Sequence, residues 1–361
     1  MEKYRVGIVG ATGMVGQRFI SLLKDHPWFE VNCVAASARS AGKTYREAVG
    51  ERWAFAWEIP EKVAGMTVVD AADIDEMSKH VDFVFCAVDM KKDEIRALEE
   101  AYAKHEIPVV SNNSACRGIE DVPMVVPEIN ADHLAVIEAQ KKRLGTKNGF
   151  IAVKPNCSIQ SYVPALTPLL DFEPEKVSVC TYQAISGAGK TFKTWPEMVD
   201  NVIPYIGGED EKSENEPLKL WGHVEDGKIV NATLPVISAQ CLRVACSDGH
   251  MAAVSVSFKK KPTIEQIKER WANYETEAQR LELPSAPKPF LQYFEDPSRP
   301  QTRLDRDFQN GFGVSIGRLR EDKLFDYRFV CLSHNTVRGA AGGGILTAEL
   351  LCRKGYIPHR V

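Results

Sequence analysis

Near its start the chain reads Gly7-Ile8-Val9-Gly10-Ala11-Thr12-Gly13-Met14-Val15-Gly16, and this stretch decides the fold. The apolar residues before it predict a short strand over 4–9, and the residues after it predict a helix through Leu23. Glycines at such a junction let the backbone approach a pyrophosphate, and the helix N-terminus favours its charge. The spacing GxxGxxG also suits a plain tight turn, but the flanking strand and helix favour a dinucleotide site.

The end of the second predicted strand, 31–36, indicates which dinucleotide binds. An NAD site usually has Asp or Glu there, to hold the ribose 2′-hydroxyl. This chain instead has two hydroxyls and a guanidinium, which suit a 2′-phosphate, although Arg39 could also be a solvated loop residue. We therefore predict NADP as the cofactor, bound in this part of the chain by Gly10, Ala11, Thr12, Gly13, Met14, Val15, Ser37, Arg39 and Ser40.

Strands and helices alternate through about residue 111, which is typical of a doubly wound parallel sheet. Strands are predicted at 81–88 and 107–110, with a helix at 91–105 between them. Beyond residue 126 a helix is predicted at 131–142, followed by longer strands around 176–184, 242–259, 311–317 and 326–332. The last helix, 341–352, is expected to return to the first domain. The prediction is a Rossmann-type α/β domain (1–126 plus 336–361) and an α+β catalytic domain (127–335).

Composition narrows the class of protein. A net charge of -4 gives no reason to expect nucleic acid or an anionic membrane as the partner. No window is long and apolar enough for a membrane span, and the N-terminus lacks the apolar core of a signal peptide. The nine cysteines include no CxxC pair, which argues against zinc and against a disulfide framework. We therefore expect a cytoplasmic protein without a metal.

A second stretch carries the chemistry: Lys154-Pro155-Asn156-Cys157-Ser158-Ile159-Gln160. It follows an apolar run, 150–153, that predicts a strand, and it precedes a helix pattern over 159–170. A cysteine near a helix N-terminus is expected to favour the thiolate. Cys157 is therefore a candidate nucleophile, although most intracellular cysteines are structural.

His250 is the best candidate for the proton carrier that such a nucleophile needs. Gly249 permits a sharp turn before it, and Arg243, seven residues upstream, suits the binding of a carboxylate. Cys246 is a rival nucleophile, but it lies within an expected strand, where a thiol is unreactive. Arg117, in a polar loop after a strand of the first sheet, is a candidate anion ligand or a surface ion-pair residue.

Two further segments are ambiguous. Residues 187–191, Gly-Ala-Gly-Lys-Thr, resemble a phosphate loop, but Ala184 stands where that motif needs its first glycine. The acidic run 208–214 is usually a solvated face. Its Lys212 could nevertheless hold an anion, with Glu209 one helical turn away for a cation.

Together these motifs resemble the aspartate-β-semialdehyde dehydrogenase family, in the branch found in archaea and fungi, over essentially the whole chain. The matching stretches include 10–16, 37–45, 111–113, 126–130, 155–158, 182–189, 201–205, 248–250 and 334–343. Two features depart from the pattern: Ala245-Cys246 before the histidine, and Cys116 beside Arg117.

The resemblance implies reduction of L-aspartyl-4-phosphate to the semialdehyde with NADPH, in a homodimer or homotetramer of lysine, methionine, threonine and isoleucine synthesis. Cys157 would form a thioester and His250 would transfer protons. Gln183 would position the substrate beside Asn156. Arg243 would hold the carboxylate and Glu209 the ammonium, while phosphate would bind Arg117 and Lys212. The resemblance also implies that Ser186, Gly187 and Asn335 contact the cofactor.

Two other functions remain open from the sequence. A malonyl-CoA reductase would share Cys157 and His250 but bind a CoA thioester. A regulatory NADP or redox sensor would have lost catalysis, although the presence of Arg243, Glu209 and Lys212 together argues against that loss.

Overall fold

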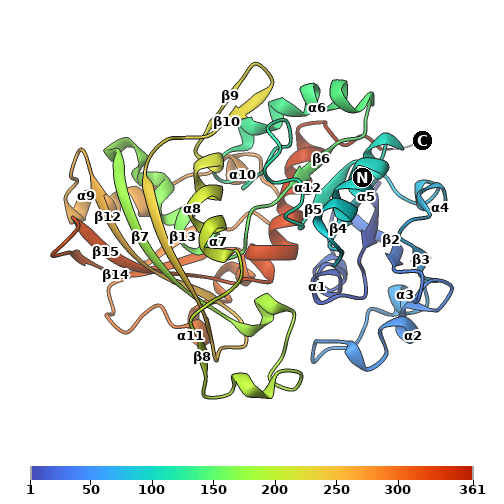
Figure 1. Ribbon diagram of the computed structural model, residues 1–361, viewed down its shortest axis with the longest axis horizontal. Helices are drawn as coiled ribbons and strands as arrows, with labels where there is room; N and C mark the ends of the chain where they lie inside the picture. Colours follow the sequence, from blue (N-terminus) through green and yellow to red (C-terminus); the bar gives the residue numbers. More distant parts are fainter. Residues whose placement is uncertain (1, 360–361) are drawn as a thin grey trace.

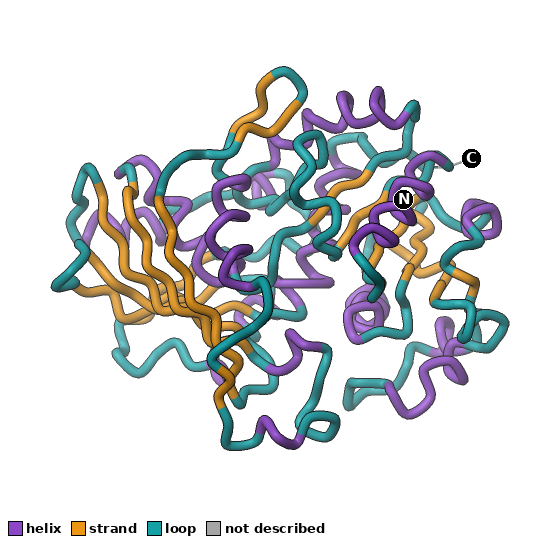
Figure 2. Tube along the Cα trace, in the orientation of Figure 1, coloured by secondary structure: helices purple, strands orange, loops and turns teal. Residues whose placement is uncertain are grey.

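The structure is a computed structural model that describes residues 2–359. Figure 1 shows two β-sheets with helices between and around them, and Figure 2 separates a large sheet on the left from a smaller one on the right. The prediction of a Rossmann-type α/β domain joined to a second domain with a mixed sheet is confirmed.

The first sheet has six parallel strands in the order β3-β2-β1-β4-β5-β6. Its strands read as apolar runs because both faces are buried. The strand order reverses between β1 and β4, where such sheets bind ligands beyond their carboxyl ends. With η marking 3₁₀ and π turns, the elements are β1 (Tyr4–Val9), α1 (Met14–Leu23), β2 (Phe29–Ala36), α2 (Tyr45–Val49), η1 (Gly50–Arg52), α3 (Glu61–Ala64), β3 (Val69–Asp70), α4 (Ile74–Ser78), β4 (Phe83–Cys86), α5 (Lys92–Lys104), β5 (Val109–Ser111), η2 (Ala131–Val136), α6 (Ile137–Leu144) and β6 (Ile151–Val153).

The second sheet is mixed, in the order β13-β14-β15-β12-β7-β11-β8. Along β12 every second residue is buried, so one face of the sheet is covered. Helices α7, α8 and α9 pack against its strands. The elements are α7 (Ile159–Leu166), η3 (Thr167–Phe172), β7 (Pro174–Gln183), η4 (Ile185–Ala188), η5 (Pro196–Met198), β8 (Val202–Ile203), α8 (Glu209–Leu220), β9 (His223–Glu225), β10 (Lys228–Val230), β11 (Val236–Val244), β12 (His250–Phe258), α9 (Ile264–Ala272), α10 (Glu277–Arg280), β13 (Leu291–Phe294), α11 (Thr302–Asp305), η6 (Phe308–Gly311), β14 (Val314–Glu321) and β15 (Tyr327–Ser333).

The structure corrects three sequence expectations. The strand expected over 242–259 is interrupted, because Gly249 adopts a φ of +99° and the chain turns between β11 and β12. Cys246 lies in that turn and not in a strand. The helix expected over 131–142 begins as the 3₁₀ turn η2, and the helix after Cys157 ends as an α-helix at Leu166, two residues before Pro168.

The chain returns to the first sheet at its end, through η7 (Val337–Ala341) and α12 (Gly342–Arg353). Ile345 and Leu346 belong to the same buried core as Ile8 of β1. A Cβ on Gly344 would lie 3.0 Å from Cζ of Phe19, so the glycine lets α12 lie close to α1. Strand β6 also belongs to the first sheet, although it lies outside the residues that we assigned to the first domain. We therefore propose that this domain runs through β6 and resumes at α12.

Candidate active site

Cys157 and His250 come from distant parts of the chain and are in contact in the structure. Cys157 lies in the turn between β6 and α7, and His250 is the first residue of β12. Cys157 Sγ is 3.5 Å from His250 Nε2. The nucleophile and the proton carrier that the sequence predicted, 93 residues apart, are thus in contact.

The hydrogen bonds of His250 determine its tautomer. The backbone N–H of Ala184 donates to Nδ1 at 3.1 Å, so in the neutral ring the proton lies on Nε2, which faces the sulfur. Burial, and next the charge of Arg243, lower the pKa of His250 to about 3. His250 is therefore a neutral hydrogen-bond donor toward Cys157 at physiological pH.

The thiol of Cys157 does not match the simple expectation of a thiolate at a helix start. Burial, and next the carboxylate of Glu209, raise its pKa, while Lys154, Arg117 and Arg243 lower it. Desolvation thus outweighs the nearby cations, because burial disfavours the charged form. A thiolate in this site depends on how well those cations are placed.

Glu209 contacts three of the other predicted site residues. It is the first residue of α8, and its carboxylate accepts hydrogen bonds from Asn156 Nδ2 at 3.0 Å and from Gln183 Nε2 at 3.2 Å. Lys212 Nζ lies 2.8 Å from Glu209 Oε1. Burial alone would raise the pKa of Glu209, but Lys212 and these hydrogen bonds outweigh it, so the pKa lies below its ordinary value. The acidic run is therefore not a solvated face at this residue, and it carries a buried carboxylate.

The two predicted arginines are also buried near the thiol. Arg117 Nη1 is 2.9 Å from Glu216 Oε1, and the other oxygen of Glu216 accepts the backbone N–H of Asn156. Arg243, at the end of β11, donates to the carbonyl of Ala184 at 2.7 Å. Arg117 is thus an ion-pair residue, as the alternative held, but one that lies inside the site.

The predicted nicotinamide side of the cofactor site adjoins His250. Asn335 donates to Ser186 Oγ at 2.8 Å and accepts the backbone N–H of Gly249. A Cβ on Gly187 would lie 3.0 Å from His250 Nε2 and 2.9 Å from Arg243 Nη1, so any larger residue there would have to displace one of these side chains. The residues Ser186, Gly187 and Asn335 are brought together with the proton carrier.

A hollow of about 780 Å³ at the carboxyl ends of the first sheet fits a dinucleotide phosphate. Six of the predicted cofactor residues line it: Gly10, Thr12, Gly13, Ser37, Arg39 and Ser40. Lys43 and Arg52 add two cations that the sequence reasoning missed. Ala11, Met14 and Val15 are not among its lining residues. The charge of this lining suits a 2′-phosphate, although Asp70 and Asp89 also line the hollow.

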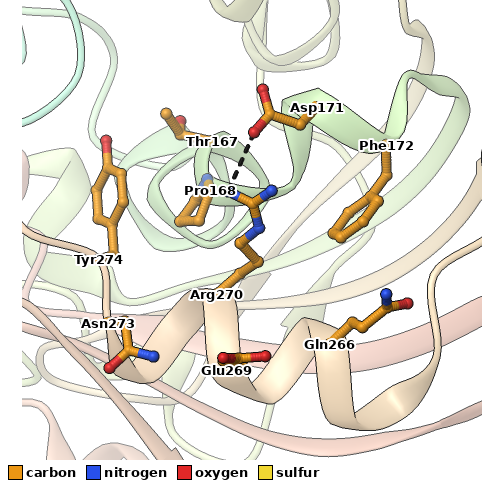
Figure 3. Close-up of a pocket in the computed structure, with 9 residues that line it drawn as sticks. All are labelled: Thr167, Pro168, Asp171, Phe172, Gln266, Glu269, Arg270, Asn273 and Tyr274. Atoms are coloured by element: carbon orange, nitrogen blue, oxygen red, sulfur yellow. Dashed lines mark ion pairs between the residues drawn. The ribbon is translucent and has the colours of Figure 1, made fainter.

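A separate hollow lies between η3 and α9 (Figure 3). Helix α9 lies at the opposite end of the molecule from the first sheet (Figure 1). Its volume is about 660 Å³, and Arg270 pairs across it with Asp171 at 3.0 Å. The nine residues drawn in Figure 3 include no cysteine and no histidine. This hollow therefore offers no nucleophile for the chemistry that Cys157 and His250 can perform.

Sequence reasoning missed Glu216 and gave no role to Lys154. The spacing could have revealed Glu216, because Glu209, Lys212 and Glu216 stand at i, i+3 and i+7 and so share one face of a helix. Lys154 lies directly before the nucleophile's turn and is 3% exposed, which a sequence cannot show for a lysine.

Comparison with known proteins agrees with this geometry. Residues 5–137 match the family described as semialdehyde dehydrogenase, NAD binding domain, and residues 166–338 match the semialdehyde dehydrogenase dimerisation domain. The chain is 45% identical to the aspartate-semialdehyde dehydrogenase of Schizosaccharomyces pombe, over 98% of this chain and 99% of that protein. The chain belongs to the aspartate-semialdehyde dehydrogenase family.

Further relatives confirm the branch that the motifs indicated. The aspartate-semialdehyde dehydrogenase of the archaeon Archaeoglobus fulgidus is 43% identical over 98% of this chain and all of its own. A crystal structure of aspartate semialdehyde dehydrogenase with NADP from the fungus Candida albicans superposes with a TM-score of 0.89 at 39% identity, covering 99% of this chain and 100% of that one. Within residues 2–359, no helix is long and apolar enough to cross a membrane.

Proposed function

We propose that this chain reduces L-aspartyl-4-phosphate to L-aspartate-4-semialdehyde with NADPH, releasing phosphate, and that Cys157 carries the acyl group as a thioester. The contact of 3.5 Å between Cys157 Sγ and His250 Nε2 carries this proposal, because it joins a nucleophile to a proton donor. The reaction is a step of amino-acid biosynthesis, leading toward lysine, methionine, threonine and isoleucine.

The thiolate of Cys157 forms a bond to the acyl carbon, and phosphate leaves with the electrons of the C–O bond that breaks. NADPH, when bound, supplies the hydride that reduces this carbon. His250 Nε2–H donates its proton to the oxygen that becomes negative, which gives the hemithioacetal. Breaking of the C–S bond then releases the aldehyde and restores the thiolate, while the hydroxyl proton returns to His250.

The charges around Cys157 match those of aspartyl phosphate. Arg243 holds the α-carboxylate, and the buried carboxylate of Glu209 holds the α-ammonium. Arg117 and Lys212 bind the phosphate. Gln183 and Asn156, which both donate to Glu209, fix the carboxylate in place for the substrate.

The glycine turn and the cations of the first sheet hold the cofactor. Gly10 lets the turn lie close to the residues after β4, because a Cβ on Gly10 would lie 2.3 Å from the carbonyl oxygen of Ala87. Ser37, Arg39 and Ser40 bind the 2′-phosphate of NADP. Ser186, Gly187 and Asn335 lie on the nicotinamide side, next to His250.

The open face of the second sheet is where two copies associate. Leu242, Met251 and Val330 are partly exposed on neighbouring strands, and Tyr182 is 37% exposed beside them. Their registry places them on the face opposite the buried residues of β12, and the matching family model names a dimerisation domain. The assembly is a homodimer, and sedimentation equilibrium would show twice the 40.2 kDa of one chain; a purely monomeric mass would contradict it.

All nine cysteines are free thiols, which suits the reducing cytoplasm that we assign to the protein.

One assay separates the candidate functions. Purified protein is given L-aspartate semialdehyde, phosphate and NADP in one reaction, and malonyl-CoA with NADPH in another. Phosphate-dependent reduction of NADP, faster than reduction of NAD, is the expected result. Activity with malonyl-CoA alone would identify a reductase of that thioester, and activity with neither substrate would favour a sensor.

A further inference from the structure

Lys154 is a buried cation beside the nucleophile. It directly follows β6, and its backbone N–H donates to the carbonyl of Ser111. Its side chain is 3% exposed and passes Gly343 of α12, whose Cβ would lie 3.9 Å from Lys154 Cδ. Its ammonium donates to the carbonyl of Pro155. Within the described residues it has no carboxylate partner within ion-pair distance, which is rare for a buried lysine.

The other cations near Cys157 are already engaged. Arg117 is paired with Glu216, and Lys212 is paired with Glu209. Arg243 donates to the carbonyl of Ala184. Lys154 and Arg243 are therefore the two nearby cations without a carboxylate partner among the described residues. Among the charges that lower the pKa of Cys157, Lys154 acts most strongly, ahead of Arg117 and Arg243.

His250 does not supply the positive charge that would stabilise a thiolate on Cys157. Its Nδ1 accepts the N–H of Ala184, so Nε2 already carries a proton and cannot take the one from the thiol. Burial and Arg243 also disfavour the imidazolium. His250 can stabilise a thiolate by donating one hydrogen bond, but the compensating charge must come from another group.

We propose that Lys154 is a positioning residue that acts through Cys157: its buried positive charge stabilises the thiolate that attacks the substrate. The inference rests on the proposed role of Cys157. The titratable and charged groups that interact with Cys157 are Glu209, Lys154, Arg117, Arg243 and His250. The groups that interact electrostatically with Lys154 are Arg117, Cys157, Glu216 and Glu209.

The protonation of Lys154 determines how the reactivity of Cys157 changes with pH. Burial, and next the charge of Arg117, lower its pKa to about 7. A thiolate on Cys157 favours the ammonium, so the two groups titrate as a pair and not independently. Replacing Lys154 by a neutral residue removes the compensating charge, so the pKa of the thiol rises and less thiolate exists at neutral pH.

The test measures alkylation of Cys157 by iodoacetamide from pH 5.5 to 9.5, with the modified peptide quantified by mass spectrometry. Lys154→Met is expected to react about tenfold more slowly at pH 7, which corresponds to a pKa raised by about one unit, and to reach the same plateau at high pH. Lys154→Arg keeps the charge and is expected to restore most of the rate. Lys142→Met, an exposed lysine on α6, makes the same change in net charge and should leave the profile unchanged.

Folding is checked by melting temperature, and Lys154→Gln replaces Lys154→Met if the latter does not fold. A folded neutral variant with the wild-type pH profile would overturn the inference. The alkylation needs no substrate, so that result is distinct from failure of the proposed function, which would appear as absence of dehydrogenase activity in the wild-type protein.

Discussion

Two strand-to-helix turns follow strands of the same parallel sheet, and they are stabilised in different ways. The turn from β1 to α1 is built by backbone. Gly10 has a φ of +89°, and a Cβ on Gly16 would lie 2.3 Å from the carbonyl oxygen of Gly10. The N–H groups of Gly10 and Ala11 donate to the carbonyl of Ala35 in β2, so the turn is held by backbone hydrogen bonds. The N-terminus of α1 that follows it favours a phosphate.

The turn from β6 to α7 is instead built by side chains. Asn156 Oδ1 accepts from the N–H of Ser158 at 2.7 Å, while its amide donates to Glu209 on α8. The sulfur of Cys157 meets His250 of β12. A Cβ on Gly339 would lie 2.9 Å from that of Cys157, so the C-terminal segment packs on it as well. The glycine turn is held mainly by its backbone, whereas the cysteine turn depends on its own side chains, which contact three other parts of the chain.

The largest expected effect on activity comes from removing the sulfur of Cys157 in the turn from β6 to α7. Cys157→Ala should lower kcat by about four orders of magnitude or more, because the covalent path is lost and the other groups act only with it. Steady-state rates with L-aspartate semialdehyde, phosphate and NADP measure this. Cys246→Ala, in the nearby turn between β11 and β12, is the matched control and should retain its rate. More than about 1% residual activity in Cys157→Ala would move the nucleophile elsewhere.

Adding one methyl group breaks the backbone turn. In Gly10→Ala the new Cβ meets the Ala87 carbonyl at 2.3 Å and the left-handed backbone is strained. The free energy of unfolding should fall by about 2–4 kcal/mol, and the Kd for NADPH should rise about tenfold or more. Thermal unfolding and fluorescence titration measure the two quantities.

Gly145→Ala is the control for strain alone. Gly145 has a φ of +72°, but its Cβ would meet open space, so the expected cost is about 1 kcal/mol with unchanged NADPH affinity. Equal losses in both variants would show that the close approach to Ala87 does not matter.

The difference between the turns explains what the sequence could reveal. The strand, glycines and helix of the first turn are contiguous, so periodicity and residue type predict its shape. The contact between Cys157 and His250 was also predictable, but through motifs and not through local pattern. Charge and burial were not. The helical spacing of α8 could have indicated Glu216, but the burial of Lys154 is visible only in the folded structure, because desolvation depends on residues remote in sequence.

The same reason accounts for the errors. The strand expected over 242–259 ignored the freedom of Gly249, and the expectation of a thiolate at Cys157 ignored burial, which raises the pKa of that thiol. Both errors concern the side-chain turn or its partners, where tertiary structure overrides the local signal.

The smallest effect tests whether the glycine turn also selects its cofactor by side chains. Arg39 lines the hollow beside Gly10 but is exposed, so water screens its charge. Arg39→Ala should lower kcat/KM for NADPH about tenfold, near 1.4 kcal/mol, and leave kcat/KM for NADH unchanged, because only NADPH carries the 2′-phosphate. Arg46→Ala, an exposed arginine paired with Glu61 at 3.2 Å and absent from that lining, should alter neither value. Equal losses for both cofactors in Arg39→Ala would mean that Arg39 supports the fold of the loop and does not read the phosphate, and selection would then lie with Lys43 or Arg52.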